Sequence, residues 1–187
     1  MTAATVLIVP GLRDHVAEHW QTLLAARLPK AVSVPPLTTD KLSLKARVAA
    51  ISAAANSIEG PVVICAHSAG VVMTAHWAMS PSRPIKAALL ACPPDIDVAM
   101  PAGYPTLAEL EAGGWFPVPR QPLPFPALVL GSETDHLAKL ERTQALAAAW
   151  GAKFVNLGAV GHLNPTSGHG HWPEAERWLA EAEALAG

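Results

Sequence analysis

The sequence has 187 residues, of which 51% are apolar and 15% are charged, and its formal net charge is −2. A chain of this length and composition is expected to fold as one globular domain, residues 1–187, with a large apolar core. It has no basic stripe to meet phosphate groups, which argues against nucleic acid as a partner.

The two cysteines and the first ten residues indicate where in the cell the protein is located. Cys65 and Cys92 lie at the ends of apolar runs, which is typical of buried reduced thiols and not of a secreted disulfide scaffold. Residues 1–10 lack a positively charged start, and the apolar run Val6–Val9 is too short for a signal peptide or a membrane span. We therefore expect a cytoplasmic protein without a membrane partner.

Short apolar runs alternate with amphipathic segments along the chain. The runs predict buried β-strands at residues 5–9, 31–34, 62–65, 85–91, 127–130 and 153–157. The segments predict helices over residues 16–28, 44–58, 71–79, 137–150 and 173–185. Ser43 is the expected N-cap of the second helix, and Pro173 occupies the first turn of the last one. This alternation predicts an α/β fold, with a parallel sheet of about six strands and helices on both faces.

The third strand leads into a pattern typical of a nucleophile elbow, a sharp turn between a strand and a helix with a serine at its apex. The strand Val62–Cys65 is followed by Ala-His-Ser-Ala-Gly, and then by the almost wholly apolar helix Val71–Met79. Such a turn needs small residues two positions before and after the serine, and Ala66 and Gly70 are small. Ser68 is therefore the candidate nucleophile. Its alternative role, which is compatible with the first, is to cap the following helix.

Two later strand-end loops supply an acid and a base. Asp135 follows the fifth strand and His162 the sixth, so the order serine, acid, histidine is that of α/β-hydrolases. A serine hydroxyl needs a base at neutral pH, and the base needs an acid to fix its tautomer. We therefore predict that Ser68, Asp135 and His162 are catalytic. For Asp135 the alternative is a cap ahead of Leu137, and Glu133 is a rival for the acid role.

Acyl transfer also needs donors for a developing oxyanion. The backbone N–H of Ala69 follows the nucleophile at a helix N-terminus, and that of Leu12 lies in the Pro-Gly-Leu turn after the first strand. We expect these two groups to form the oxyanion hole. His67 adjoins the serine on a tight turn and is expected to be structural, whereas His136 is expected to line the substrate pocket.

A second use of histidine is a metal site, because His162 lies near a His-x-His pair, His169 and His171. The loop contains no cysteine and no carboxylate at ligand spacing. We therefore expect no metal and no cofactor.

The segment from Pro93 to Pro126 differs from the rest of the chain, because nine prolines interrupt it. Proline prevents long regular elements, so only Thr106–Ala112 is expected to form a short helix. The segment follows the strand expected beside the elbow, and we predict that it forms a stiff wall over the site. Trp115 and Phe116, at its centre, are expected to bind substrate; the alternative is that they are core residues.

The chain resembles the small α/β-hydrolases of the retinoblastoma-binding-protein-nine and YdeN type. The similarity lies in Pro10-Gly11-Leu12 with His19-Trp20-Gln21, in the elbow His67–Gly70, and in Gly161–Gly168 followed by Trp172-Pro173-Glu174. The resemblance implies a compact hydrolase core without two antiparallel N-terminal strands, and Ser68, Asp135 and His162 as the catalytic triad. Ala66 replaces the usual glycine, and His136 stands where the family commonly has proline; neither change removes a catalytic group.

The sequence therefore predicts a serine hydrolase that cleaves a small carboxylic ester or a related acyl bond through an acyl-enzyme. The alternative is a protein-binding module on a hydrolase scaffold, since a fold alone does not establish function. A complete set of nucleophile, base and acid in strand-end loops favours the enzyme.

Overall fold

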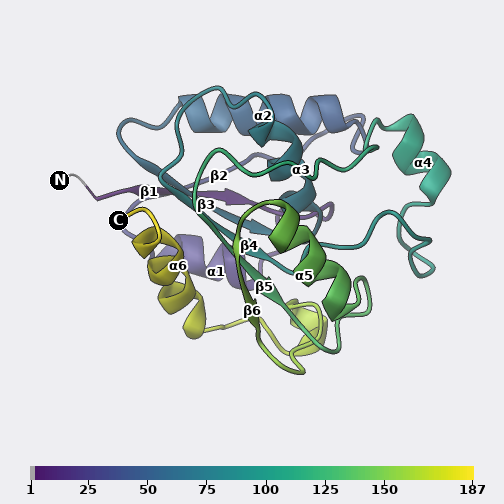
Figure 1. Cartoon of the computed structure of the whole chain (residues 1–187). Helices are drawn as coiled ribbons and strands as arrows, with labels where there is room; N and C mark the ends of the chain where they lie inside the picture. The colour runs from purple at the N-terminus through teal and green to yellow at the C-terminus, as the bar shows by residue number, and fades with distance from the viewer. Residues whose placement is uncertain (1–2) are drawn as a thin grey trace.

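Six parallel strands form the centre of the protein, which the computed structural model describes from residue 3 to residue 187. The strands are β1 (Thr5–Val9), β2 (Ala31–Ser33), β3 (Val62–His67), β4 (Ala87–Ala91), β5 (Ala127–Gly131) and β6 (Lys153–Asn156). They form one sheet in the order β2-β1-β3-β4-β5-β6 (Figure 1). Every neighbouring pair is parallel, so the predicted six-stranded parallel sheet is confirmed.

The burial of the strands explains their sequence pattern. The four inner strands, β1, β3, β4 and β5, are buried at every residue. Both faces of such a strand need an apolar cover, so the sequence shows an unbroken apolar run instead of an alternation. The edge strands β2 and β6 are partly exposed, and their sequences are correspondingly mixed.

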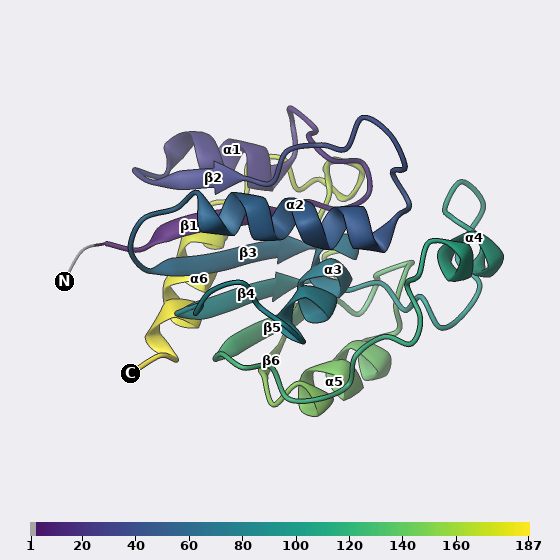
Figure 2. The ribbon, with the colours of Figure 1, turned by 90° about the horizontal axis from the view of Figure 1, so that it is seen from above.

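Helices cover both faces of the sheet, as predicted. They are α1 (Trp20–Arg27), α2 (Leu44–Asn56), α3 (Ala69–Ala78), α4 (Leu107–Ala112), α5 (Leu140–Ala149) and α6 (Glu174–Ala184), with a short 3₁₀ helix at Pro165–Ser167. Buried residues of α2, α3 and α5 form one apolar cluster with the sheet, and those of α1 and α6 form another. These two groups of helices lie on opposite faces (Figure 2).

Local hydrogen bonds set where the helices begin. Ser43 is the N-cap of α2, as predicted, because its hydroxyl accepts the N–H of Ala46 at 3.3 Å. Helix α1 begins later than predicted, at Trp20, because the imidazole Nδ1 of His19 accepts the N–H of Gln21 at 3.2 Å. Helix α5 begins three residues later than predicted, because the chain before it is held in a turn that belongs to the site.

The proline-rich segment between β4 and β5 contains the predicted short helix, α4, which projects from the body of the molecule (Figure 2). Thr106 caps this helix and forms a capping box with Glu109. After α4 the chain is tied to the start of α2, where Gly113 accepts the N–H of Leu44 at 2.9 Å. The residues just after α4 therefore pack beside α2 and α3, and the chain from Pro119 to Leu123 is hydrogen-bonded to Trp150 at the end of α5.

This return path corrects the prediction that Trp115 and Phe116 bind substrate. The side chain of Trp115 is fully buried, and its indole N–H donates to the carbonyl of Leu42 at 2.8 Å. Its carbonyl accepts the Nε2–H of His76 at 3.1 Å. Phe116 packs against the same apolar cluster. The alternative interpretation, that the pair belongs to the core, is the one that the structure supports.

Trp115→Ala is expected to lower the free energy of unfolding by about 3–5 kcal/mol, since it leaves a large cavity and an unpaired carbonyl. Val98→Ala is the matched control, because Val98 lies in the same segment and is 51% exposed; it should change stability by less than about 0.5 kcal/mol. Urea denaturation of both variants measures the difference. Equal stabilities would place Trp115 outside the core.

Candidate active site

Ser68 stands at the apex of the turn between β3 and α3. Its backbone angles are φ 56° and ψ −132°, a region that residues other than glycine rarely adopt. Its N–H donates to the carbonyl of Ala91 in β4 at 3.0 Å, and helix α3 begins at the next residue. The backbone conformation is therefore that of the predicted nucleophile elbow.

Close packing around the turn explains its small residues. A Cβ on Gly70 would lie 2.3 Å from the carbonyl oxygen of Val9, so only glycine fits there. Ala66 is fully buried within β3, and its methyl group belongs to the main apolar cluster. A Cβ on Gly11 would lie 3.2 Å from the Cβ of Ser68, which shows how closely the loop after β1 approaches the serine.

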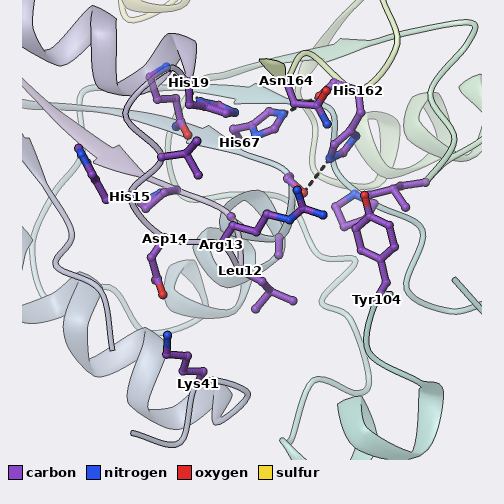
Figure 3. Close-up of a pocket in the computed structure, with 18 of the residues that line it drawn as sticks. Leu12, Arg13, Asp14, His15, His19, Lys41, His67, Tyr104, His162 and Asn164 are labelled. Atoms are coloured by element: carbon purple, nitrogen blue, oxygen red, sulfur yellow. Dashed lines mark hydrogen bonds between the residues drawn. The ribbon is translucent and has the colours of Figure 1, made fainter. Parts of the chain in front are cut away.

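A chain of hydrogen bonds joins the three predicted catalytic residues. The hydroxyl of Ser68 lies 2.8 Å from Nε2 of His162 (Figure 3). Nδ1 of the same ring lies 2.9 Å and 2.8 Å from the two carboxylate oxygens of Asp135. The side chains of His162 and Asp135 are only 4% and 3% exposed. In this arrangement Nδ1–H donates to the carboxylate, and Nε2 is left as the acceptor for the serine proton.

The carboxylate of Asp135 also makes the capping contact that the sequence analysis gave as an alternative to its catalytic role. It accepts the N–H of Leu137 at 2.9 Å, so the same side chain shapes the turn and holds the imidazole. The rival acid, Glu133, is exposed and accepts the side-chain N–H of Asn156 at 2.8 Å. The geometry therefore favours Asp135 over Glu133 as the partner of His162.

Two further imidazoles pack on the ring of His162, and a third packs on one of these two. His67 packs on it with ring centroids 4.9 Å apart, and His19 packs on His67 at 4.7 Å. The Nε2–H of His67 donates to the carbonyl of His162 at 2.8 Å, which is a structural contact, as the sequence predicts. Burial lowers the pKa of His67, and the neighbouring His162 lowers it further. Burial, helped by His162, likewise lowers the pKa of His19 to about 4.

His136 covers another side of the same ring, with centroids 5.6 Å apart. It is exposed, and its Nε2 lies 3.0 Å from the hydroxyl of Tyr104 in the proline-rich segment. His136 is not among the residues that line the cavity beside Ser68, but it lines a neighbouring cavity with Asp135 and Met100, and its partner Tyr104 lines the first. Its role in binding substrate therefore stays a prediction.

The cavity in front of Ser68 has a volume of about 320 Å³, at the small end of the range for ligand sites. Leu12 and Ala69 line it together with the serine. The predicted wall from the proline-rich segment is present, but its first half supplies it: Pro94, Ile96, Met100, Gly103, Tyr104, Pro105 and Leu110. The residues from Trp115 onward lie elsewhere.

The described residues, 3–187, contain no cluster of three His, Cys, Asp or Glu side chains that is placed to ligate a metal ion. Within the same range no helix is long and apolar enough to span a membrane.

Solved structures place the protein among the α/β-hydrolases. It is similar to a YdeN-like hydrolase of Pectobacterium atrosepticum, with 26% identity, a TM-score of 0.79, and coverage of 98% of this chain and 92% of that one. The ydeN gene product of Bacillus subtilis matches with 15% identity, a TM-score of 0.75, and coverage of 97% and 100%. The esterase domain of a Rhodothermus marinus protein matches with 18% identity, a TM-score of 0.67, and coverage of 98% and 88%.

The sequence gives the family. The profile of the family described as serine hydrolase matches residues 6–181, and the chain belongs to this family. Its structural similarity to YdeN-like proteins agrees with the resemblance inferred from the motifs. A search of curated protein sequences gives no significant match. Family and fold together identify the protein as a hydrolase.

The lowered pKa of His19 predicts a pH-dependent stability. Its folded pKa of about 4 lies below the ordinary value of 6.5, so the unfolded chain binds the proton more readily between these values. This contribution to stability is complete above pH 6.5 and is lost as the pH falls toward 4. We expect it to cost wild-type protein about 1–2 kcal/mol between about pH 7 and about pH 5.

His19→Asn isolates this effect, because asparagine can still cap α1 and does not titrate. Urea denaturation at both pH values should show a smaller loss in the variant than in the wild type. The assignment fails if the two proteins lose the same free energy of unfolding, because the loss then comes from other groups.

Proposed function

We propose that the protein hydrolyses a small carboxylic ester or a related acyl bond through an acyl-enzyme. Ser68 is the nucleophile, His162 the general base, and Asp135 the acid that orients the imidazole. The observation that carries this proposal is the continuous set of hydrogen bonds from the serine hydroxyl to the carboxylate, at 2.8–2.9 Å, beside a small cavity.

The proposed reaction proceeds in two halves. The oxygen of Ser68 attacks the ester carbonyl while its proton moves to Nε2 of His162. The tetrahedral intermediate then expels the alcohol, which takes that proton and leaves an ester between the acyl group and the serine. Water gives a proton to the same nitrogen and attacks this acyl-enzyme, and the departing serine oxygen recovers the proton. Each proton in these steps moves between the serine, the imidazole, the alcohol and water.

The oxyanion of each tetrahedral intermediate is assigned to the backbone N–H groups of Leu12 and Ala69. Ala69 is the first residue of α3, where unpaired N–H groups and the helix dipole favour a negative charge. Leu12 follows Gly11, whose backbone lies against the side chain of Ser68. Both residues line the cavity, which supports the assignment.

The neighbouring imidazoles suit this mechanism because they remain neutral. Burial lowers the pKa of both His19 and His67, so neither carries a charge at neutral pH. The positive charge that develops on His162 therefore meets the carboxylate of Asp135 beside a neutral His67 ring. Two buried free thiols, Cys65 and Cys92, support the further proposal that the protein acts in the cytoplasm.

Ser68→Ala is expected to lower ester turnover by a factor of about 10⁴ to 10⁶, because the variant has no nucleophile. It should also abolish labelling by a fluorophosphonate probe. Ser80→Ala is the control, since Ser80 is an exposed serine just beyond α3. A folded Ser68→Ala variant that keeps a tenth of wild-type turnover would exclude the nucleophile, and an unlabelled wild type would favour the binding-module alternative.

Asp135→Asn should lower turnover of p-nitrophenyl butyrate by about 10⁴, because the amide no longer stabilises the imidazolium or its tautomer. Glu133→Gln is the matched control two residues away and should keep wild-type turnover. The amide can still accept the N–H of Leu137, so thermal melting should show that both variants remain folded. A greater loss in Glu133→Gln would reverse the assignment of the acid.

A further inference from the structure

The cavity beside Ser68 carries a charge opposite to that of the whole protein. The chain has a net charge of −2. Arg13, Asp14 and Lys41 are the Asp, Glu, Lys and Arg residues that line the cavity within the described residues 3–187. Two of these three side chains are cationic, so the local balance is positive where the molecule as a whole is negative.

The one lining carboxylate does not neutralise these cations, because it is already paired. Asp14 forms an ion pair with Arg47, and the two side chains are only 8% and 5% exposed. A second hydrogen bond, at 2.9 Å, runs from Nε of Arg47 to the carbonyl of Lys41 and holds the pair in place. Arg47 thus fully compensates Asp14 from behind the cavity wall.

Arg13 and Lys41 themselves form no ion pair with any residue between positions 3 and 187. Both side chains are exposed toward the cavity and are free to bind an anion. The imidazoles of His19 and His67 in the same wall are neutral, because burial lowers their pKa. The two cations are therefore the fixed positive charges available to a ligand in this part of the wall.

Arg13 lies close to the proposed reacting groups, and Lys41 lies further from them (Figure 3). Arg13 lies two residues after Gly11, whose backbone packs against Ser68. Figure 3 shows the side chain of Arg13 extending across the cavity in the direction of His162, whereas Lys41 lies at the opposite end, near Asp14. A planar guanidinium binds a carboxylate through two parallel hydrogen bonds, which fixes the orientation of the ligand as well as attracting it.

We propose that Arg13 binds a carboxylate on the substrate, while Lys41 attracts the same charge from the opposite end of the cavity, so that the protein prefers small esters that carry a negative charge. This inference rests on the proposed ester hydrolysis and specifies its substrate class. Leu12, Leu42 and Leu110 give the cavity an apolar lining for the short carbon chain between the ester and the carboxylate. The carboxylate belongs to either the acyl or the alcohol part, and the probes below distinguish the two.

The first experiment compares esters that differ in one group. Monoethyl glutarate and ethyl valerate have the same acyl chain length, but the first ends in a carboxylate and the second in a methyl group. O-Butyrylglycolate, the ester of butyric acid with the hydroxyl of glycolate, carries the carboxylate on the alcohol side. Ethyl butyrate is its neutral match. Release of the alcohol gives kcat/KM for each. Wild-type protein should prefer one carboxylate ester over its neutral match by about 10- to 100-fold, the usual effect of a charged hydrogen bond.

Arg13→Gln should reduce this preference ratio at least about tenfold, and Lys41→Gln should reduce it less. Lys45→Gln is the matched control: it removes the same charge from an exposed residue of the same region that does not line the cavity, and it should keep the wild-type ratio. The wild-type ratio should also fall between about 0.02 M and about 0.5 M NaCl, because salt screens exposed charges. A wild type without preference, or a ratio unchanged by Arg13→Gln, overturns the inference.

A binding measurement separates this inference from the proposed function. Isothermal titration calorimetry with glutarate does not depend on turnover. Wild-type protein should bind glutarate at least about tenfold more tightly than Arg13→Gln does, and Lys45→Gln should bind it like the wild type. If neutral esters are hydrolysed through Ser68 but glutarate binds equally to wild type and Arg13→Gln, only the anion site is wrong. If no ester is hydrolysed but glutarate binding depends on Arg13, the anion site stands and the proposed reaction fails.

Discussion

The strained backbone of Ser68 is the constraint on which the rest of the site depends. A non-glycine residue with φ 56° and ψ −132° persists only where the surrounding structure holds it. Here the hydrogen bond to Ala91, the start of α3 and the contact of Gly70 with Val9 hold the turn from three directions. The sheet and its buried helix therefore determine where the hydroxyl points, and the other groups of the site are arranged around that position.

Each partner of the serine is fixed by more than its own loop. His162 is held through its ring by Asp135 and through its backbone carbonyl by His67, which belongs to the strand that carries the serine. Asp135 is in turn held by the N–H of Leu137. These contacts keep Nε2 of His162 at 2.8 Å from the hydroxyl of Ser68 and leave the imidazole little freedom to rotate away.

The sequence predicted the sheet and the meeting of Ser68, Asp135 and His162 because both follow from short apolar runs and the residues directly after them. An unbroken apolar run marks a strand buried on both faces, and residues that directly follow parallel strands lie at one edge of the sheet. The core position of Trp115 could not be predicted in this way. The position of Trp115 depends on contacts with Leu42 and His76, which are far from it in the sequence. The preceding pair Gly113-Gly114 allows the chain to turn either toward the cavity or toward the core.

The charges of the cavity were missed for a related reason. Arg13 and Lys41 lie in separate loops without a periodic pattern, and the sequence alone does not show that both line one cavity or that Arg47 compensates the carboxylate between them. Such features arise only when the chain has folded. The histidine contacts are similar: His19 lies far from His162 in sequence, and only the tertiary structure brings their rings into one packed group.

The proposed catalytic groups and one wall of the cavity come from different segments of the chain, which affects how the substrate range of such a protein can change in evolution. The proposed catalytic groups and oxyanion donors lie in loops after β1, β3, β5 and β6, whereas one wall of the cavity comes from the single segment after β4. Insertions or replacements in that segment would reshape the space around a ligand while the strained turn and its hydrogen-bonded partners stayed in place. New substrate ranges can therefore evolve on this scaffold through changes to one connection, without rebuilding the chemistry.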